Sequence, residues 1–173
     1  QQRLTAEMLR DQSLKITGLL NTKVGGPSVK PHQPEGLWTE VSSGGRYQRK
    51  YMVGSGEDLY RRSLYTYWKR IAPPPAMLIF DADPRGVCNV KRQSTNTPLQ
   101  SLVLLNDPQF LNASKALAHK MIKNGNNSQQ RISYGFRCGT SRKPNSKEIE
   151  ILKDLFLIEK NEFEKHPYRA YDL

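Results

Sequence analysis

The sequence predicts a mainly α-helical fold, an irregular helical array of about six helices with a long Gly/Pro-rich loop insertion. Apolar residues recur at helical spacing in several segments, and Thr-Pro and Asp-Pro pairs stand where two of these segments begin. Residues 21–56 lack such spacing and are interrupted repeatedly by Gly, Pro and Ser. At 173 residues the chain suits one domain, so we expect residues 1–173 to form a single helical domain.

The first half of the chain predicts two helices around the long loop. The first follows Thr5, a good N-cap, and ends near Asn21, with an apolar face of Met8, Leu9, Ile16, Leu19 and Leu20. Within the loop 21–56, Trp38 is expected to be a hydrophobic anchor. The second helix is predicted over 57–71 and stops at three prolines; its core face comprises Tyr60, Leu64, Tyr67 and Ile71.

The second half predicts an irregular segment, 73–97, and then four helices. Two of these begin at Pro98 and Pro108, a third covers 131–139, and the last runs from Asn145 or Ser146 to about 164. In the last helix, Ile151 and Ile158 lie away from the main apolar stripe. This second apolar edge indicates contact with another domain or chain, or burial on two sides.

The formal net charge of +11 has two interpretations. An anionic partner would explain it, and so would solvated cations on ordinary helix faces. Lys and Arg are spread along the chain and no nucleic-acid module is recognisable, which favours the second interpretation and argues against nucleic acid. No apolar run approaches the roughly 18 residues of a membrane span.

Asp81, Asp83 and Arg85 are the candidate catalytic residues. Two carboxylates beside a cation have the chemistry of a general acid and base, or of a cation site. The alternative, which we favour, is structural: Asp-x-Asp-Pro forms an Asx turn, and Asp81 pairs with Arg61, Arg62 or Arg92.

The candidate ligand-binding residues form a predicted cationic helix edge with aromatic neighbours. Arginine and lysine there would bind phosphate, sulfate or uronic carboxylates, and a tyrosine would stack on a sugar or base. A solvated helix face would give the same pattern. The candidates are Arg61, Arg62, Tyr65, Lys69 and Arg70, together with Arg92 and Asn96 in the irregular segment.

Metal and thiol chemistry have little support in the sequence. His32, His119 and His166 are scattered, so no metal site is predicted. Cys88 and Cys138 form neither a Cys-x-x-Cys nor a haem-attachment motif. Whether they pair is left open, and we expect Cys88 to be a buried structural thiol.

Several blocks resemble a known family. RLTAEMLRD, ITGLLNTKVGGPSVKPHQPEGLW, DLYRRSLYTYWKR, APPPAMLIFDADPRGVC and TNTPLQSLVLLNDPQF occur in this order. Together they resemble the C-terminal part of a family of unknown function, catalogued as fifteen fifty-three, from large exported proteins of planctomycetes and related bacteria. The family commonly reads DAPDREVC where this chain has DADPRGVC, which weakens a catalytic role for Asp83.

The resemblance implies a setting but no activity. We expect the chain to be a C-terminal fragment of an exported, periplasmic or cell-surface protein. It would hold no cofactor itself, and any haem c would lie in an upstream cytochrome c domain.

The resulting functional hypothesis is a non-catalytic or accessory helical domain. It docks upstream domains of the same polypeptide or binds an anionic polymer such as an acidic polysaccharide. The alternative is part of the active site of a secreted, cytochrome-linked enzyme acting on polysaccharide, with Asp81 as acid or base and Arg62 or Arg85 as anion clamp. Catalysis predicts that Asp81 and Arg85 converge in a pocket, whereas docking predicts exposed Ile151 and Ile158.

Overall fold

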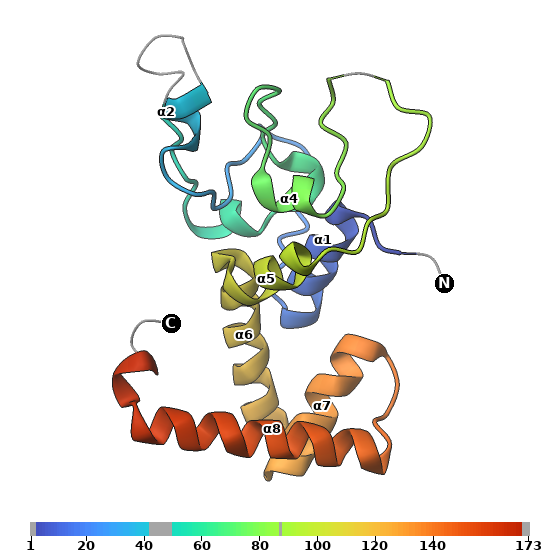
Figure 1. The fold of residues 1–173 in the computed structure, drawn as a ribbon, viewed down its shortest axis with the longest axis vertical. Helices are drawn as coiled ribbons and strands as arrows, with labels where there is room; N and C mark the ends of the chain where they lie inside the picture. Colours follow the sequence, from blue (N-terminus) through green and yellow to red (C-terminus); the bar gives the residue numbers. More distant parts are fainter. Residues whose placement is uncertain (1–2, 42–49, 87, 171–173) are drawn as a thin grey trace. The chain divides into compact units, whose positions relative to one another are not determined.

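The computed structural model describes residues 3–41, 50–86 and 88–170, which are mainly helical, as predicted (Figure 1). The chain divides into two compact units, Gln1–Ala113 and Ser114–Leu173, which are described separately. Up to the division the elements are α1 (Ala6–Thr17), α2 (Leu37–Val41), the 3-10 helices η1 (Gly56–Tyr60) and η2 (Ser63–Tyr65), α4 (Pro75–Ile79), α5 (Pro98–Asn106) and the start of α6 (Pro108–Asn124). The remaining elements are α7 (Ser128–Thr140), α8 (Ser146–Lys165) and η3 (Pro167–Ala170).

Helix α1 forms where the sequence predicts it, but its most buried residues are not those of the predicted apolar face, of which Leu9, Ile16, Leu19 and Leu20 are half-buried. The Thr5 side chain accepts a hydrogen bond from the Met8 amide at 3.3 Å, which confirms the N-cap. The Met8 side chain itself is 57% exposed. The buried residues of α1 are Ala6, Arg10, Leu14 and Thr17, so this helix packs against its unit through a partly polar face.

Buried Arg10 explains why that face is polar. Its Nη1 donates to the Arg61 carbonyl and its Nη2 to the Leu59 carbonyl, both at 2.8 Å. Next to it on α1, the Asp11 carboxylate accepts from both the amide and the hydroxyl of Ser63 at 2.7 Å. Helix α1 therefore holds the backbone of residues 59–63 by charge-assisted hydrogen bonds.

The helix predicted over 57–71 does not form. Its place is taken by η1, η2 and extended backbone. The Tyr60 carbonyl accepts from the Asn21 amide at 2.9 Å, and the Tyr65 carbonyl accepts from the Val29 amide at 2.8 Å. Because these carbonyls are bonded to a distant segment, they are unavailable for intrahelical bonds. The predicted core residue Leu64 is 67% exposed.

Within its described residues, 21–41 and 50–56, the predicted loop includes the short helix α2, and its predicted anchor is confirmed. Trp38 is 5% exposed, and its ring meets the Tyr51 ring edge-on at 5.0 Å between centroids. The segment 73–97 is likewise not wholly irregular, because α4 begins at Pro75, where proline suits the first turn. Met77 of α4 forms a small buried cluster with Ala6 and Ala82.

Helices α7 and α8 confirm the last two predicted helices. Helix α7 begins three residues earlier than predicted, because the Asn127 side chain accepts from the Gln130 amide at 2.9 Å and caps it. Asn145 and Glu148 form a capping box at the start of α8. Arg142 pairs with Glu148, and this hydrogen bond lowers the Glu148 pKa to about 2.

Candidate functional site

The site is organised by a loop that leaves α4 and returns to α5. Asp81 follows α4 with a positive φ of 61°, a conformation that Asp tolerates better than most residues. Its carboxylate accepts from the Thr95 amide at 2.7 Å and from the Thr95 hydroxyl at 2.8 Å. The amide bond is the main reason that the Asp81 pKa lies below its usual range. We call the described residues between these two positions, 82–86 and 88–94, the strap.

Asp83 and Arg85 shape the first turn of the strap. The Asp83 carboxylate accepts from the Arg85 amide at 2.8 Å, which confirms the predicted Asx turn. The Arg85 guanidinium lies 4.6 Å from the centroid of the Trp68 ring. The Trp68 indole N–H donates to the Pro84 carbonyl at 3.1 Å. The Trp68 side chain thus contacts the turn at both Pro84 and Arg85. Asp81 is hydrogen-bonded to Thr95 and not to the arginines that the sequence predicted as its partners.

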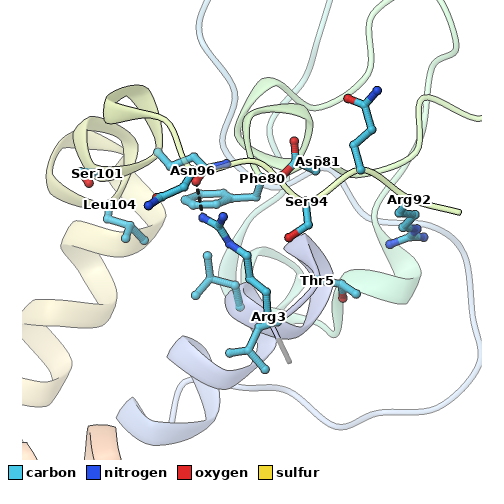
Figure 2. Close-up of a pocket in the computed structure, with 13 residues that line it drawn as sticks. Arg3, Thr5, Phe80, Asp81, Arg92, Ser94, Asn96, Ser101 and Leu104 are labelled. Carbon is cyan, nitrogen blue, oxygen red and sulfur yellow. Dashed lines mark hydrogen bonds between the residues drawn. The ribbon is translucent and has the colours of Figure 1, made fainter. Parts of the chain in front are cut away.

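A cavity of about 500 Å³ lies between the strap, the start of α1 and the start of α5 (Figure 2). We call it the arginine pocket, because Arg3 and Arg92 both line it together with Asp81. Three predicted site residues, Asp81, Arg92 and Asn96, therefore meet in one cavity. Figure 2 shows the Arg3 side chain reaching toward the Phe80 ring. The pocket also has apolar lining residues, which are Leu4, Leu9 and Leu104.

Both arginines of this pocket are held in place. The Arg92 guanidinium donates to the Glu7 carboxylate at 2.8 Å. Arg3 donates to the side-chain oxygen of Gln100. Gln100 is 4% exposed and donates in turn to the Ile79 carbonyl at 2.9 Å. A guanidinium has five N–H groups, so each arginine keeps donors beyond these bonds.

A second cavity, of about 440 Å³, adjoins the first along the strap. We call it the aspartate pocket, because Asp81 and Asp83 both line it. Lys91 and Asn89 are also in its lining, and it shares Asp81, Arg92 and Gln93 with the arginine pocket. Asp81 lines both pockets, whereas Arg85 is in the lining of neither.

The other predicted ligand-binding residues lie elsewhere. Arg61 is 3% exposed, and its guanidinium donates to the Pro27 carbonyl at 3.0 Å and covers the Tyr65 ring at 3.9 Å. Arg62 and Arg70 are exposed, and Lys69 lies 4.2 Å from the centroid of the Trp38 ring. Because the helix over 57–71 is absent, no common edge gathers these five residues.

Sequence reasoning missed Arg3, Phe80 and Gln100. Gln100 had a signal, since it is the amide side chain in TPLQSLVLL, a segment made mostly of apolar residues. Nothing in the pattern around Arg3 distinguishes it from other surface arginines. Its role depends on the approach of the segment before α1 to Gln100 of α5, which is a tertiary property.

The structure also bears on the sequence-based expectations for metal sites, membrane spans and the two cysteines. Within residues 3–41, 50–86 and 88–170, no group of three or more His, Cys, Asp or Glu is arranged to hold a metal ion. Over the same ranges, none of the helices has the length and apolar character needed to span a membrane. Cys88 and Cys138 are free, and Cys88 is exposed, which corrects its expected burial.

The family is settled by a match over most of the chain. Residues 1–156 fit the family described as PSD1, protein of unknown function (DUF1553). The chain belongs to this family. It matches no curated protein and no solved structure. Membership in DUF1553 confirms the family resemblance seen in the sequence blocks.

Proposed function

We propose that this chain is a non-catalytic binding domain whose arginine pocket takes an acidic residue of a polysaccharide. The observation that carries the proposal is that two arginines, Arg3 and Arg92, line one cavity of about 500 Å³. Such a volume is in the usual range of small-ligand sites. The proposal places the protein outside the cytoplasm, as an exported or cell-surface protein.

The lining of the arginine pocket suits a uronic acid. Guanidinium groups recognise carboxylates through paired N–H donors. Side chains of Asn96, Ser94 and Gln93 add amide and hydroxyl groups for sugar hydroxyls, and the Phe80 ring adds an apolar surface for a ring face. The lining contains two cations, Arg3 and Arg92, and one carboxylate, Asp81, and the Glu7 carboxylate bonded to Arg92 offsets one of the two cations.

The state of Asp81 favours binding over catalysis. A general acid at neutral pH needs a raised pKa, as a carboxyl in an apolar site has. Asp81 has a lowered pKa, caused first by the hydrogen bond from the Thr95 amide. Its carboxylate is committed to Thr95, which closes the strap. We therefore assign Asp81 a structural role in the proposed binding site.

The test compares two arginines that carry the same charge. Arg3→Gln removes a cation from the pocket, whereas Arg62→Gln removes an exposed cation outside its lining. We expect Arg3→Gln to weaken binding of oligogalacturonate about tenfold in calorimetry, the loss of one charge-assisted hydrogen bond. We expect Arg62→Gln to bind like the wild type. Equal losses would show that overall charge, not the pocket, retains the polymer and would refute the proposal.

A second candidate function is docking of another domain of the same polypeptide on α8. Ile151 and Ile158, predicted to be exposed by the docking hypothesis, are 60% and 64% exposed, and Leu155 between them is 52% exposed. These three residues share one face of the helix, at spacings of four and three. In a longer polypeptide, docking predicts hydrogen-exchange protection of α8 that Ile151→Glu removes. Equal exchange of α8 in the long polypeptide and in this chain would refute it.

A further inference from the structure

We propose that the strap binds two consecutive residues of an alternating polysaccharide, with an acidic residue in the arginine pocket and a neutral residue in the aspartate pocket. This inference rests on the proposed function and specifies its ligand. The inference specifies which polymer binds and which of its residues occupies each pocket. The residues that decide this are Arg92, which lines both pockets, and Asp83, which lines only the aspartate pocket.

The shared lining of the two pockets places the subsites next to each other. Asp81, Arg92 and Gln93 line both cavities, so ligand groups in the two pockets contact the same side chains. Arg92 and Gln93 are exposed and accessible to a ligand. The cavities, about 500 and 440 Å³, are similar in size, as expected for successive units of one chain. Two adjoining subsites of this kind suit a polymer better than a single small molecule.

The charges of the two pockets differ, and this difference sets the register. The arginine pocket has Arg3 and Arg92 with one carboxylate, Asp81, and Arg92 is also paired with Glu7. The aspartate pocket has Lys91 and Arg92 balanced by Asp81 and Asp83. Each pocket is lined by two cations, but the aspartate pocket has one carboxylate more, Asp83, so a ligand carboxylate is less favourable there than in the arginine pocket. A neutral sugar avoids this cost and offers hydroxyl or acetamide groups to Asn89 and Asp83.

Arg92 is the residue that both sugars would contact. Its Nη1 is bonded to Glu7, which orients the guanidinium from the side of α1. The remaining N–H groups of a guanidinium can still donate to an acidic sugar and to the linkage that follows it. Arg92 therefore positions the acidic residue relative to the strap, while Arg3 is specific to the arginine pocket.

The experiment compares two tetrasaccharides on the whole 173-residue chain. One is a hyaluronan tetrasaccharide, which alternates glucuronate with N-acetylglucosamine, and the other is tetragalacturonate, in which every residue is acidic. Calorimetry is expected to show about tenfold tighter binding of the alternating tetrasaccharide, since a misplaced carboxylate beside Asp83 costs on the order of 1 kcal/mol or more.

The decisive variant is Asp83→Asn, because Asn keeps the Asx turn while removing the carboxylate charge. Asp58→Asn, at an exposed carboxylate on η1, is the control with the same change in net charge. We expect Asp83→Asn to tighten tetragalacturonate binding several-fold and leave the alternating ligand nearly unchanged, whereas Asp58→Asn changes neither preference. Arg3→Gln should weaken the binding of both tetrasaccharides by the same factor.

The outcomes separate this inference from the proposed function. If the wild type binds neither tetrasaccharide, the proposed function fails, and this inference fails with it. If it binds both equally, or prefers tetragalacturonate, the proposed function stands and the alternating register is refuted. The alternating register is also refuted if Asp83→Asn and Asp58→Asn change the preference by the same factor, because the effect is then one of general charge.

Discussion

Asp81 and Thr95, fourteen positions apart, are joined by hydrogen bonds from both the amide and the hydroxyl of the threonine. The amide bond measures 2.7 Å and the hydroxyl bond 2.8 Å. They close the strap between α4 and α5 into a loop with fixed ends. Since the strap contributes Arg92 and Gln93 to both pockets, this pair determines whether the candidate site exists.

Replacement of Asp81 tests this role directly. Asp81→Asn keeps a side chain that tolerates the positive φ of 61° but weakens the bonds from Thr95, and we expect it to cost about 1 kcal/mol of unfolding free energy. Asp81→Ala loses the bonds and also disfavours that backbone conformation, so its cost should exceed that of Asp81→Asn. Urea unfolding of the wild type and the two variants measures the order of their unfolding free energies. Equal stability of all three would contradict the assigned role.

The same carboxylate predicts a dependence on pH. The folded-state pKa of Asp81 is lowered, first by the Thr95 amide bond, and therefore lies below its unfolded value. Its stabilising contribution is present above the unfolded pKa of about 3.9 and is lost as the pH falls through the folded value. The stability difference between wild type and Asp81→Asn should therefore be constant from pH 7 to 5 and shrink below the unfolded pKa. A difference that grows with acid would contradict this.

Glu7 is predicted to compete with the ligand for Arg92. In Glu7→Gln the carboxylate charge is removed, so the arginine pocket becomes more positive and Arg92 donates more readily to an acidic sugar. We expect binding of tetragalacturonate to tighten about threefold, with a change in stability below about 1 kcal/mol because the pair is partly exposed. Weaker binding would indicate instead that Glu7 mainly orients Arg92.

Arg10 is predicted to be a costly residue of α1 to replace, although its side chain is charged. In Arg10→Met the carbonyls of Leu59 and Arg61 lose their donor in a buried region, and we expect a loss of about 3 kcal/mol in unfolding free energy. Lys15→Met, at an exposed position of the same helix, is the control and should stay within about 0.5 kcal/mol. Thermal and urea unfolding of both variants check the contrast.

Replacement by alanine should change the stability of the second unit in opposite directions at two of its glycines, Gly125 and Gly139. A Cβ at Gly125 would lie 2.7 Å from the Arg131 amide nitrogen, so Gly125→Ala should cost about 2 kcal/mol. A Cβ at Gly139, in α7, would have no atom within 4 Å, so Gly139→Ala should stabilise by about 0.5 kcal/mol through helix propensity. Hydrogen exchange of the α7 amides measures both effects, and destabilisation by Gly139→Ala would contradict the second prediction.

The helices that sequence analysis located correctly begin at local signals. Thr5 and Asn145 cap α1 and α8 with their own side chains, and Pro98 and Pro108 occupy first helical positions. These interactions span only a few residues, so they can be read from the sequence. The buried face of α1 could not, because Arg10 is buried only where residues 59 and 61 supply carbonyl acceptors.

The absent helix over 57–71 has the same explanation. Its residues have helical spacing, yet their carbonyls accept from Asn21, Val29 and Arg10, which are remote in sequence. Each of these bonds replaces an intrahelical one, and the buried guanidinium makes the exchange favourable. Local propensity is a weak prior that tertiary hydrogen bonds override here.

For the candidate site, the sequence alone determined the residue types and the Asx turn at Asp83, and it placed Asp81, Arg92 and Asn96 in one segment. Only the tertiary structure decided that Arg3 and Phe80 join them in a pocket and that Arg61 is buried beneath a loop. Turns and caps are set by neighbours along the chain. A pocket is set by side chains that approach from different elements, and no local pattern encodes that approach.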